Sequence, residues 1–598
     1  MGKETKTRDQ IDPKYKWKIE EMYPDEEQWK IDYKTVEDKA KDFTGYSGRL
    51  GESPRILLEA LQKKDAIWLI LEKVYTYARM KKDEDNRVDQ YQAMSDKAGT
   101  LIAKTSSYLS FFIPELLEIP EEKLRGFMEA EEGLKLYQHA INDILREKAH
   151  VLSKAEENLL AQMSEITGAT NDVFTMINNA DIKFGSILDE DGDEVEVTHG
   201  RYIGFMESHD RRVRKEAYEH MYKAYTDLKN TLATNYNYNT KTDVITARIR
   251  KYGSAREAAL SGDNIPLEVY DNLIDTVNSR LDVLHRYVEV RRKMLALDEV
   301  HMYDMYVPLV EMPKEEIPYE KALDLMREGL SPLGEDYLKK MNAGIEAGWI
   351  DVFENEGKTS GAYSFGSYDS MPYILLNYNG KLKDVFTIVH EMGHSMHSYY
   401  TRHNQPFVYG GHSIFTAEVA STVNEALLMN HMLSNSRNPE EKKYLLNLYI
   451  EEFRTTLFRQ TMFAEFEKLT HAAVESGEVL TAEWLCSEYG KLNKKYYGDK
   501  VAYDSQIVME WARIPHFYRA FYVYKYATGY SAAAAISSKI LKEGPAARDA
   551  YIEFLKTGES DYPIELLKIA GVDMGKPEPI IQAMDAFEKL VVEIEKLV

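Results

Sequence analysis

Three histidines and a glutamate fall within eight residues of the stretch FTIVHEMGHSMHSYY, which covers positions 386–400. His390 and His394 are four residues apart, so on a helix their imidazoles project from one face and can bind the same metal ion. Glu391 is turned by about 100° around such a helix. That places it to reach a water molecule in an open metal position rather than the metal itself. The spacing predicts a metal site in which Glu391 is the general base.

A catalytic site of this kind needs a third protein ligand. The downstream stretch IFTAEVASTVNEALLMNHML, residues 414–433, predicts a second helix that carries Glu418 and Glu425 on one face. Glu418 follows His394 by 24 residues, which suits a helix-loop-helix return. Two histidines and a glutamate leave the fourth position open to water, as in catalytic rather than structural zinc sites. We predict one zinc ion per chain, bound by His390, His394 and Glu418; the alternative is that these side chains only pair with each other in the core.

The residues around the motif carry further expectations. Asp384 is a candidate N-cap for the histidine-bearing helix. Gly393 costs about 1 kcal/mol relative to alanine inside a helix, a cost that tight packing next to the metal would explain. His397 is expected to pack beside the ligands, because a fourth protein ligand would block the open position. His403 and His412 are expected in a loop, without a direct role.

Composition narrows the class of protein. Hydrophobic residues make up 44% and charged residues 29% of the 598 residues, which is typical of a folded globular chain. A net charge of −24 disfavours nucleic acid as a partner. No apolar run is long enough to span a membrane, and the first residues lack the apolar core of a signal peptide. With the single cysteine Cys486, these features predict a cytoplasmic protein without disulfides.

Most of the sequence repeats apolar residues three and four apart, which predicts a mainly α fold. Two stretches differ. Residues 182–200 read as a β-hairpin around an Asp-Gly turn. Residues 360–380 are rich in Gly, Ser and Tyr and contain a strand-like run at 373–378, just before the histidine cluster. We predict a small β-sheet beside the histidine-bearing helix, an N-terminal helical region at 1–200 and a catalytic domain at 201–598.

Several motifs occur in an order that resembles a known family. HEMGHSMH is followed by FTAEVASTVNEALL, preceded by GKTSGAYS, and followed further on by HFYRAFYVYKYATG and FLKTGESDYPIELLKIAGVDM. Together they resemble the M3 family of zinc oligopeptidases, and most closely its oligoendopeptidase F group. The resemblance covers residues 201–574, and the first 200 residues resemble the N-terminal region of the family more loosely.

The resemblance implies a helical ellipsoid of the zincin type, split by a deep channel with zinc at its floor, which admits short peptides and excludes folded proteins. The region 1–200 would be a wall or cap of this channel. His390, His394 and Glu418 match the zinc ligands of the family and Glu391 its catalytic glutamate. His516 matches a histidine near the scissile carbonyl, and Tyr522 and Tyr526 are the nearest matches to tyrosines that stabilise the oxyanion.

The resemblance also suggests how a peptide binds. In the family, the segment before the histidine-bearing helix lines the channel. An extended peptide can add as a strand to an exposed sheet edge, where backbone hydrogen bonds give affinity without demanding a particular sequence. The expected substrate-binding residues are Tyr373, Leu375 and Leu376 in the strand-like run, and Gly361 and Ala362 in the glycine-rich loop beside it.

The resulting hypothesis is a zinc endopeptidase that hydrolyses short, unstructured oligopeptides. One alternative is a zinc carboxypeptidase or dipeptidyl carboxypeptidase, which would remove residues only from the C-terminus. A second alternative is a peptide-binding protein without catalysis, whose zinc is structural. The sequence predicts oligopeptide substrates, no nucleic acid and no membrane, and it leaves the oligomeric state open.

Overall fold

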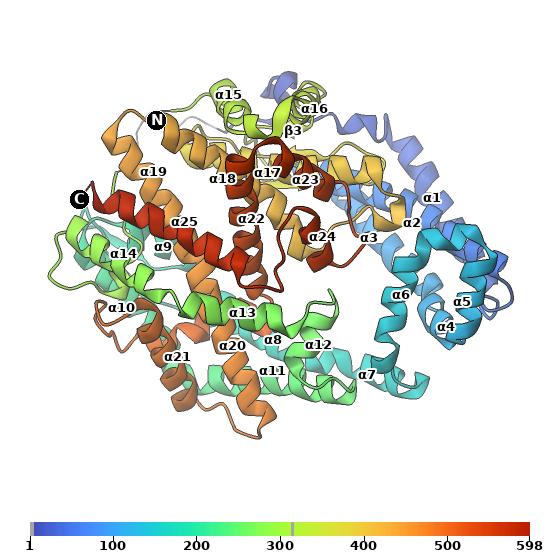
Figure 1. Ribbon diagram of the computed structural model, residues 1–598, viewed down its shortest axis with the longest axis horizontal. Coiled ribbons are helices and arrows are strands. Elements are labelled where there is room, and N and C mark those ends of the chain that lie inside the picture. Colours follow the sequence, from blue (N-terminus) through green and yellow to red (C-terminus); the bar gives the residue numbers. More distant parts are fainter. Residues whose placement is uncertain (1–4, 312–315, 598) are drawn as a thin grey trace. The chain divides into compact units, whose positions relative to one another are not determined.

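The computed structural model describes residues 5–311 and 316–597. The described chain forms two compact units, each assembled from three separate stretches. The first unit combines residues 5–149, 316–428 and 536–571, and the second combines 150–311, 429–535 and 572–597. The predicted fold class, mainly helical with small sheets, is confirmed (Figure 1). The predicted boundary near Gly200 divides the sequence and does not coincide with a limit of either unit. The two predicted regions therefore stay a prediction.

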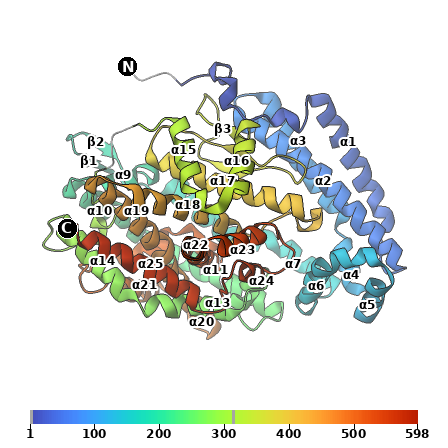
Figure 2. The same ribbon diagram turned by 45° about the horizontal axis from the view of Figure 1, so that its top comes forward.

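In the first unit, three long helices lie side by side (Figure 2). They are α1 (Glu26–Phe43), α2 (Pro54–Glu84) and α3 (Asp89–Leu109). The Ser53 side chain accepts a hydrogen bond from the Ile56 N–H and, with a proline at the first helical position, starts α2. The other helices that lie wholly in this unit are α4 (Phe112–Glu118), α5 (Glu121–Ala130), α6 (Gln138–Arg146), α15 (Tyr319–Gly329), α16 (Gly334–Glu346), α17 (Leu382–Asn404), α23 (Pro545–Leu555) and α24 (Pro563–Ile569).

A three-stranded sheet packs against α17 in the same unit. Its strands are β3 (Ile350–Asp351), β4 (Tyr363–Phe365) and β5 (Tyr373–Leu375), in the order β3-β5-β4. Strand β5 pairs in parallel with β3 and antiparallel with β4. Side chains of β5 join the apolar core that α1, α2 and α3 form. The predicted small sheet beside the histidine-bearing helix is therefore present, and the N-terminal helices support it.

Helix α17 carries the HExxH motif and begins at Leu382, three residues earlier than its predicted cap implied. Lys381 is extended and is the N-cap residue. Asp384 is instead the third residue of the helix, where its Oδ2 accepts from the Asn379 N–H at 2.9 Å and the Lys381 N–H at 3.0 Å. A carboxylate in the first turn satisfies donors that have no partner within the helix. The helix also extends through His403, which was expected in a loop.

The second unit is also helical and contains the predicted hairpin. Strands β1 (Ser186–Leu188) and β2 (Glu194–Glu196) pair antiparallel, and Gly192 in the turn between them has a φ of +86°. Its helices are α7 (Lys154–Thr167), α8 (Ala169–Met176), α9 (His199–Glu207), α10 (Arg211–Asp227), α11 (Lys229–Ile249), α12 (Ala255–Ser261), α13 (Leu267–Asn278), α14 (Leu281–Met294), α19 (Pro439–Glu452), α20 (Arg459–Glu475), α21 (Ala482–Tyr497) and α25 (Glu578–Glu595). Within the described residues, no helix has the length and apolar character needed to cross a bilayer.

Candidate metal centre

The structure brings His390 and His394 of α17 together with Glu418 of α18 (Ile414–Asn435). One potential ligand atom from each lies within 4.8 Å of the other two. Glu418 Oε2 is 3.5 Å from His390 Nε2 and 3.7 Å from His394 Nε2. Ligands about 2.0–2.1 Å from a tetrahedral metal ion are separated by about 3.3–3.5 Å. The donor types and their spacing therefore fit a divalent metal ion.

Gly393 permits α17 and α18 to approach closely at this point. A Cβ atom at this position would lie 2.5 Å from Ser421 Cα and 2.7 Å from the carbonyl oxygen of Ala420, both in the backbone of α18. No side chain fits between backbones at that separation. The tight packing expected for this glycine is therefore present, and it sets the distance from the two histidines to the glutamate.

Polar side chains of α18 hold the two helices in register. Asn424 donates from Nδ2 to the backbone carbonyl of Val389, one residue before His390, at 3.3 Å. Ser421 donates to both the backbone carbonyl of Glu418 at 2.9 Å and its Oε2 at 3.3 Å. These contacts fix the Glu418 carboxylate relative to α17.

Each candidate histidine ligand also contacts a second group on α18. His390 Nδ1 lies 3.1 Å from Glu425 Oε2, and the His394 ring is hydrogen-bonded to the backbone of Ala417. A hydrogen bond from Nδ1 to a carboxylate orients the ring, so that Nε2 can bind a metal once its own proton is displaced. The sequence placed Glu425 on the face of Glu418 but gave it no role, and the structure assigns it this contact.

The charges around the ligands perturb the histidines in opposite directions. Burial opposes protonation of His390, but the carboxylates of Glu425, Glu391 and Glu418 outweigh it and raise its pKa to about 9. Burial and the neighbouring His390 lower the pKa of His394 to about 4. An acidic pocket of this kind, with one histidine already neutral, favours a bound cation.

Glu391 lies on α17 and only 8% of its surface is exposed. Burial raises the pKa of Glu391 to about 7, with His390 opposing the shift and Glu418 adding to it. Its carboxylate also accepts a backbone hydrogen bond from Ser364 of β4. The Ser364 hydroxyl lies 2.8 Å from the Ser395 hydroxyl, which ties β4 to α17. A carboxyl group with a pKa near neutral can both accept and return a proton.

His397 lies beside the site but not among the ligands. Its ring stacks on His412 at a centroid distance of 3.8 Å and packs against Phe554. Burial lowers the pKa of both histidines, so the pair is neutral. His412 lies in the loop before α18, as expected, while His403 lies in the last turn of α17.

His516, Tyr522 and Tyr526 form an aromatic cluster in the second unit. His516 lies on the short helical turn Pro515–Tyr518, and Tyr526 lies in the first turn of α22 (Tyr524–Glu543). The ring centroids of His516 are 5.9 Å from those of Tyr522 and of Tyr526, and the two tyrosine rings are 5.4 Å apart. Burial, with Arg519 and Arg459, lowers the pKa of His516. His516, Tyr522 and Tyr526 therefore lie together. Their catalytic roles stay predictions.

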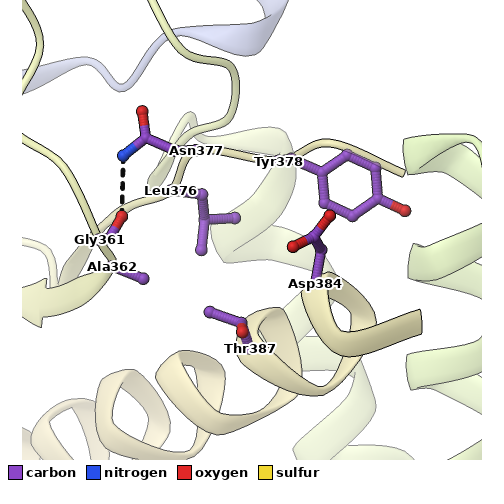
Figure 3. A pocket seen from close by; sticks show the side chains of 7 residues that line it. All are labelled: Gly361, Ala362, Leu376, Asn377, Tyr378, Asp384 and Thr387. Carbon is purple, nitrogen blue, oxygen red and sulfur yellow. Dashed lines mark hydrogen bonds between the residues drawn. The ribbon is translucent and has the colours of Figure 1, made fainter. Parts of the chain in front are cut away.

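Gly361, Ala362 and Leu376 line one pocket of about 310 Å³ in the first unit (Figure 3). Asn377 closes its wall by donating from Nδ2 to the carbonyl oxygens of Gly361 at 2.8 Å and Thr359 at 3.0 Å. The remaining lining comes from Tyr378, Asp384 and Thr387. Because Thr387 precedes Glu391 by four residues on α17, the pocket lies one helical turn from the proposed general base.

The strand-edge role expected for Tyr373 and Leu375 is corrected by the sheet order. Strand β5 lies between β3 and β4, so its backbone groups already pair on both sides. The two side chains are buried in the core. A peptide can add only to an unpaired edge, and β4 has one neighbour in the sheet. The strand itself was predicted, but its central position was not.

Two helices that present a HExxH pair and a downstream glutamate beside a small sheet define a metallopeptidase of the helical zincin type. Residues 204–586 match the model of peptidase family M3, and residues 115–184 match a model described as oligopeptidase F. The chain belongs to peptidase family M3.

Known relatives agree with this assignment along the whole chain. Oligopeptidase PepF of Bacillus subtilis is 50% identical over 590 residues, which cover 99% of this chain and 88% of the relative. The crystal structure of oligoendopeptidase F from Enterococcus faecium is 38% identical with a TM-score of 0.74, over 96% of this chain and 99% of that one. A crystal structure from Chlamydophila abortus is 36% identical with a TM-score of 0.95 and covers 100% of both chains.

Replacing Gly393 by alanine tests the close approach of α17 and α18. The added methyl group meets backbone atoms of α18, so the helices must separate, and we expect a loss of about 1–3 kcal/mol in stability. Because Glu418 moves with α18, metal affinity should fall at least about tenfold. Metal titration and thermal unfolding measure both effects.

Gly99 provides the matched control. It lies within α3 of the same unit, and nothing lies within 4 Å of a Cβ at that position. Gly99→Ala should leave metal affinity unchanged and raise stability by up to about 1 kcal/mol. Equal metal affinity in Gly393→Ala and the native protein would contradict the proposed spacing role.

Replacing Glu425 by alanine tests the contact to His390 Nδ1. Loss of such a partner typically weakens metal binding about 10- to 100-fold, and we expect an effect of that size in a competition titration with a chelator. Glu425→Gln keeps an acceptor for the Nδ1 proton and should lose less affinity. If Glu425→Ala binds metal as tightly as the native protein, the ring of His390 is oriented by other contacts.

Proposed function

We propose that this protein is a zinc-dependent endopeptidase that cuts internal bonds of short, unstructured oligopeptides. The observation that carries the proposal is the convergence of His390, His394 and Glu418, with the buried Glu391 next to them. Two imidazoles and one carboxylate, with no thiolate, are typical ligands of catalytic zinc. The preference for oligopeptides rests on the similarity to oligopeptidase PepF and oligoendopeptidase F.

His390, His394 and Glu418 would hold the metal. A bound zinc ion would polarise the scissile carbonyl group and make water nucleophilic near neutral pH. Glu391 would take a proton from that water and later deliver it to the leaving nitrogen, a transfer suited to a carboxyl group with a pKa near 7. The backbone N–H of Ser364 would keep the carboxylate oriented during both transfers.

His516 and one of the two tyrosines would stabilise the oxyanion. Negative charge develops on the carbonyl oxygen during hydrolysis, and removing one hydrogen-bond donor from such a site typically costs about 2.7–4 kcal/mol in the transition state. A His516 ring with a lowered pKa is neutral near pH 7 and offers one N–H. Tyr522 and Tyr526 each lie 5.9 Å from it, centroid to centroid, and would be the hydroxyl donors.

We propose that the peptide backbone lies along the unpaired side of β4 and that a side chain occupies the pocket lined by Gly361, Ala362 and Leu376. The free edge of β4 takes the place of the β5 edge that the sequence suggested. Backbone pairing of this kind accommodates many sequences, which suits a peptidase that acts on mixed oligopeptides.

A carboxypeptidase would use the same metal ligands, so the products decide between the two functions. Mass spectrometry of peptides about 5–30 residues long, after incubation with the zinc-loaded protein, should show internal cuts confined to the shorter peptides. Successive losses from the C-terminus would identify a carboxypeptidase, and no products from the loaded protein would favour a peptide-binding function. The cytoplasmic location proposed from the single cysteine is consistent with peptide turnover.

Glu391→Gln tests the general base directly. The amide keeps the shape of the side chain but cannot accept the proton, so turnover should fall by at least about 100-fold. Zinc content and thermal stability should remain near the native values, because the side chain is not among the converging ligand atoms. Glu418→Ala is the complementary variant and should lose zinc. Turnover retained by Glu391→Gln would refute the proposed mechanism.

Gly361→Ala tests the peptide-binding pocket. Gly361 has a φ of +85°, which an alanine adopts only with strain, so the loop should shift and raise KM several-fold. Gly48→Ala is the control, because Gly48 has a φ of +79°, lies in the same unit and likewise has open space at its Cβ. Both variants should lose similar stability, and only Gly361→Ala should change KM in a peptide-hydrolysis assay.

A further inference from the structure

The loop that carries His516 and Tyr522 contains a strained residue. Phe521, immediately before Tyr522, has a φ of +53°. Bulky side chains rarely adopt this left-handed conformation, and such residues persist only where the surroundings hold them. The Phe521 side chain is 2% exposed, and its ring lies 4.4 Å from the ring of His471 and 5.7 Å from that of Tyr270. Both the backbone and the side chain are therefore fixed by buried neighbours.

A buried glutamate holds the backbone of this residue. Glu467 on α20 has 0% exposure, and its Oε1 accepts a hydrogen bond from the Phe521 N–H at 2.9 Å. Burial raises the pKa of Glu467 well above its ordinary value and so favours the neutral acid. Among the described residues, its Oε2 has no hydrogen-bond partner. A buried carboxyl group with one backbone N–H as its hydrogen-bond partner needs a functional explanation.

The polar contacts continue from Glu467 to the other end of the loop. His471 Nδ1 lies 2.8 Å from the backbone oxygen of Glu467, and His471 Nε2 lies 3.4 Å from Asp243 Oδ2. Asn239 contacts Asp243 at 3.4 Å and donates to the backbone oxygen of Phe517 at 3.5 Å. The network thus contacts the backbone at Phe517, next to His516, and at Phe521, next to Tyr522.

The rings of His516 and Tyr522, which precede and follow the backbone contacts at Phe517 and Phe521, are nearly parallel. His516 and Tyr522 are stacked with an interplanar angle of 9°, and Arg519 lies 4.2 Å from the Tyr522 ring. Because the left-handed turn at Phe521 sets the direction in which the chain enters Tyr522, a change in φ there would rotate the tyrosine away from the histidine. The hydrogen bond from the Phe521 N–H to Glu467 therefore lies at the turn between the two proposed oxyanion donors.

We propose that Glu467 is a positioning residue, which holds Phe521 in the left-handed conformation and thereby aligns His516 and Tyr522 for peptide hydrolysis. This inference rests on the proposed function of His516 and Tyr522. It assigns Glu467 no contact with substrate or metal. The alternative is a purely structural role, in which Glu467 stabilises the second unit and has no influence on the rate.

Two substitutions of Glu467 test whether a hydrogen-bond acceptor is needed at this position. Glu467→Gln keeps an oxygen acceptor and resembles the neutral acid. Glu467→Met has similar length but cannot accept from the Phe521 N–H. We expect kcat of Glu467→Met to fall roughly 10- to 100-fold with KM nearly unchanged, the size expected when reacting groups are misplaced by about 1 Å. Glu467→Gln should stay within about threefold of the native kcat because its acceptor replaces the carboxyl oxygen.

A matched variant controls for stability. Val288 is fully buried on α14 of the same unit, and Val288→Ala removes core packing without touching the network. Assayed well below its unfolding temperature, Val288→Ala should keep the native kcat even where its loss of thermal stability equals that of Glu467→Met. Zinc content should be native in all three variants.

Hydrogen exchange followed by mass spectrometry gives a readout that does not depend on activity. Residues 515–523 should exchange about tenfold or more faster in Glu467→Met than in the native protein, Glu467→Gln or Val288→Ala. Faster exchange together with the lower kcat supports the proposal. Native exchange of this segment, or a native kcat, in Glu467→Met overturns it. If His516→Ala itself retains the native kcat, the proposed function of the loop fails instead, whatever the exchange data show.

Discussion

The site depends on the close approach of two helix backbones. Gly393 lies between the two turns of α17 that carry the histidines, and the backbone of α18 at Ser421 occupies the space that any side chain there would need. Glu418 is one turn before Ser421, so the contact point and the candidate third ligand move together. A helix interior normally disfavours glycine by about 1 kcal/mol, and here the cost is offset by a ligand geometry that no larger residue permits.

The sheet and the N-terminal helices give this helix pair a fixed support. Asp83 near the end of α2 accepts hydrogen bonds from the Thr359 hydroxyl at 2.7 Å and the Tyr363 hydroxyl at 2.8 Å. These contacts bind the glycine-rich loop and β4 to the N-terminal helices, while Ser364 joins β4 to α17. Residues 5–149 are therefore part of the same compact unit as the candidate metal ligands, although hundreds of residues separate them in the chain.

The sequence was most informative where one local pattern determines the geometry. The four-residue spacing of the histidines and the helical periodicity around Glu418 were enough to predict that they converge. The first turn of α17 was predicted less well, because an aspartate near a helix start can accept from backbone N–H groups that follow it, as an N-cap residue, or from ones that precede it, as the third helical residue. Asp384 does the second. The position of β5 could not be predicted, since strand order depends on partners at 350–351 and 363–365 and not on the apolar run alone. The anchor at Glu467 was missed because a lone glutamate in an amphipathic helix gives no sign of burial.

In each unit a carboxyl group contacts a proposed functional residue or the backbone beside one. Glu425 faces the Nδ1 of His390, Glu391 accepts from the Ser364 backbone, and Glu467 accepts from the Phe521 backbone. A carboxyl group in apolar surroundings loses its water, so one N–H donor becomes a far stronger constraint than it is at the surface. The desolvation cost explains why buried carboxyls are uncommon away from such tasks. Glu391 and Glu467 are both buried, so their contacts carry this desolvation cost, and the proposed orienting roles would account for it.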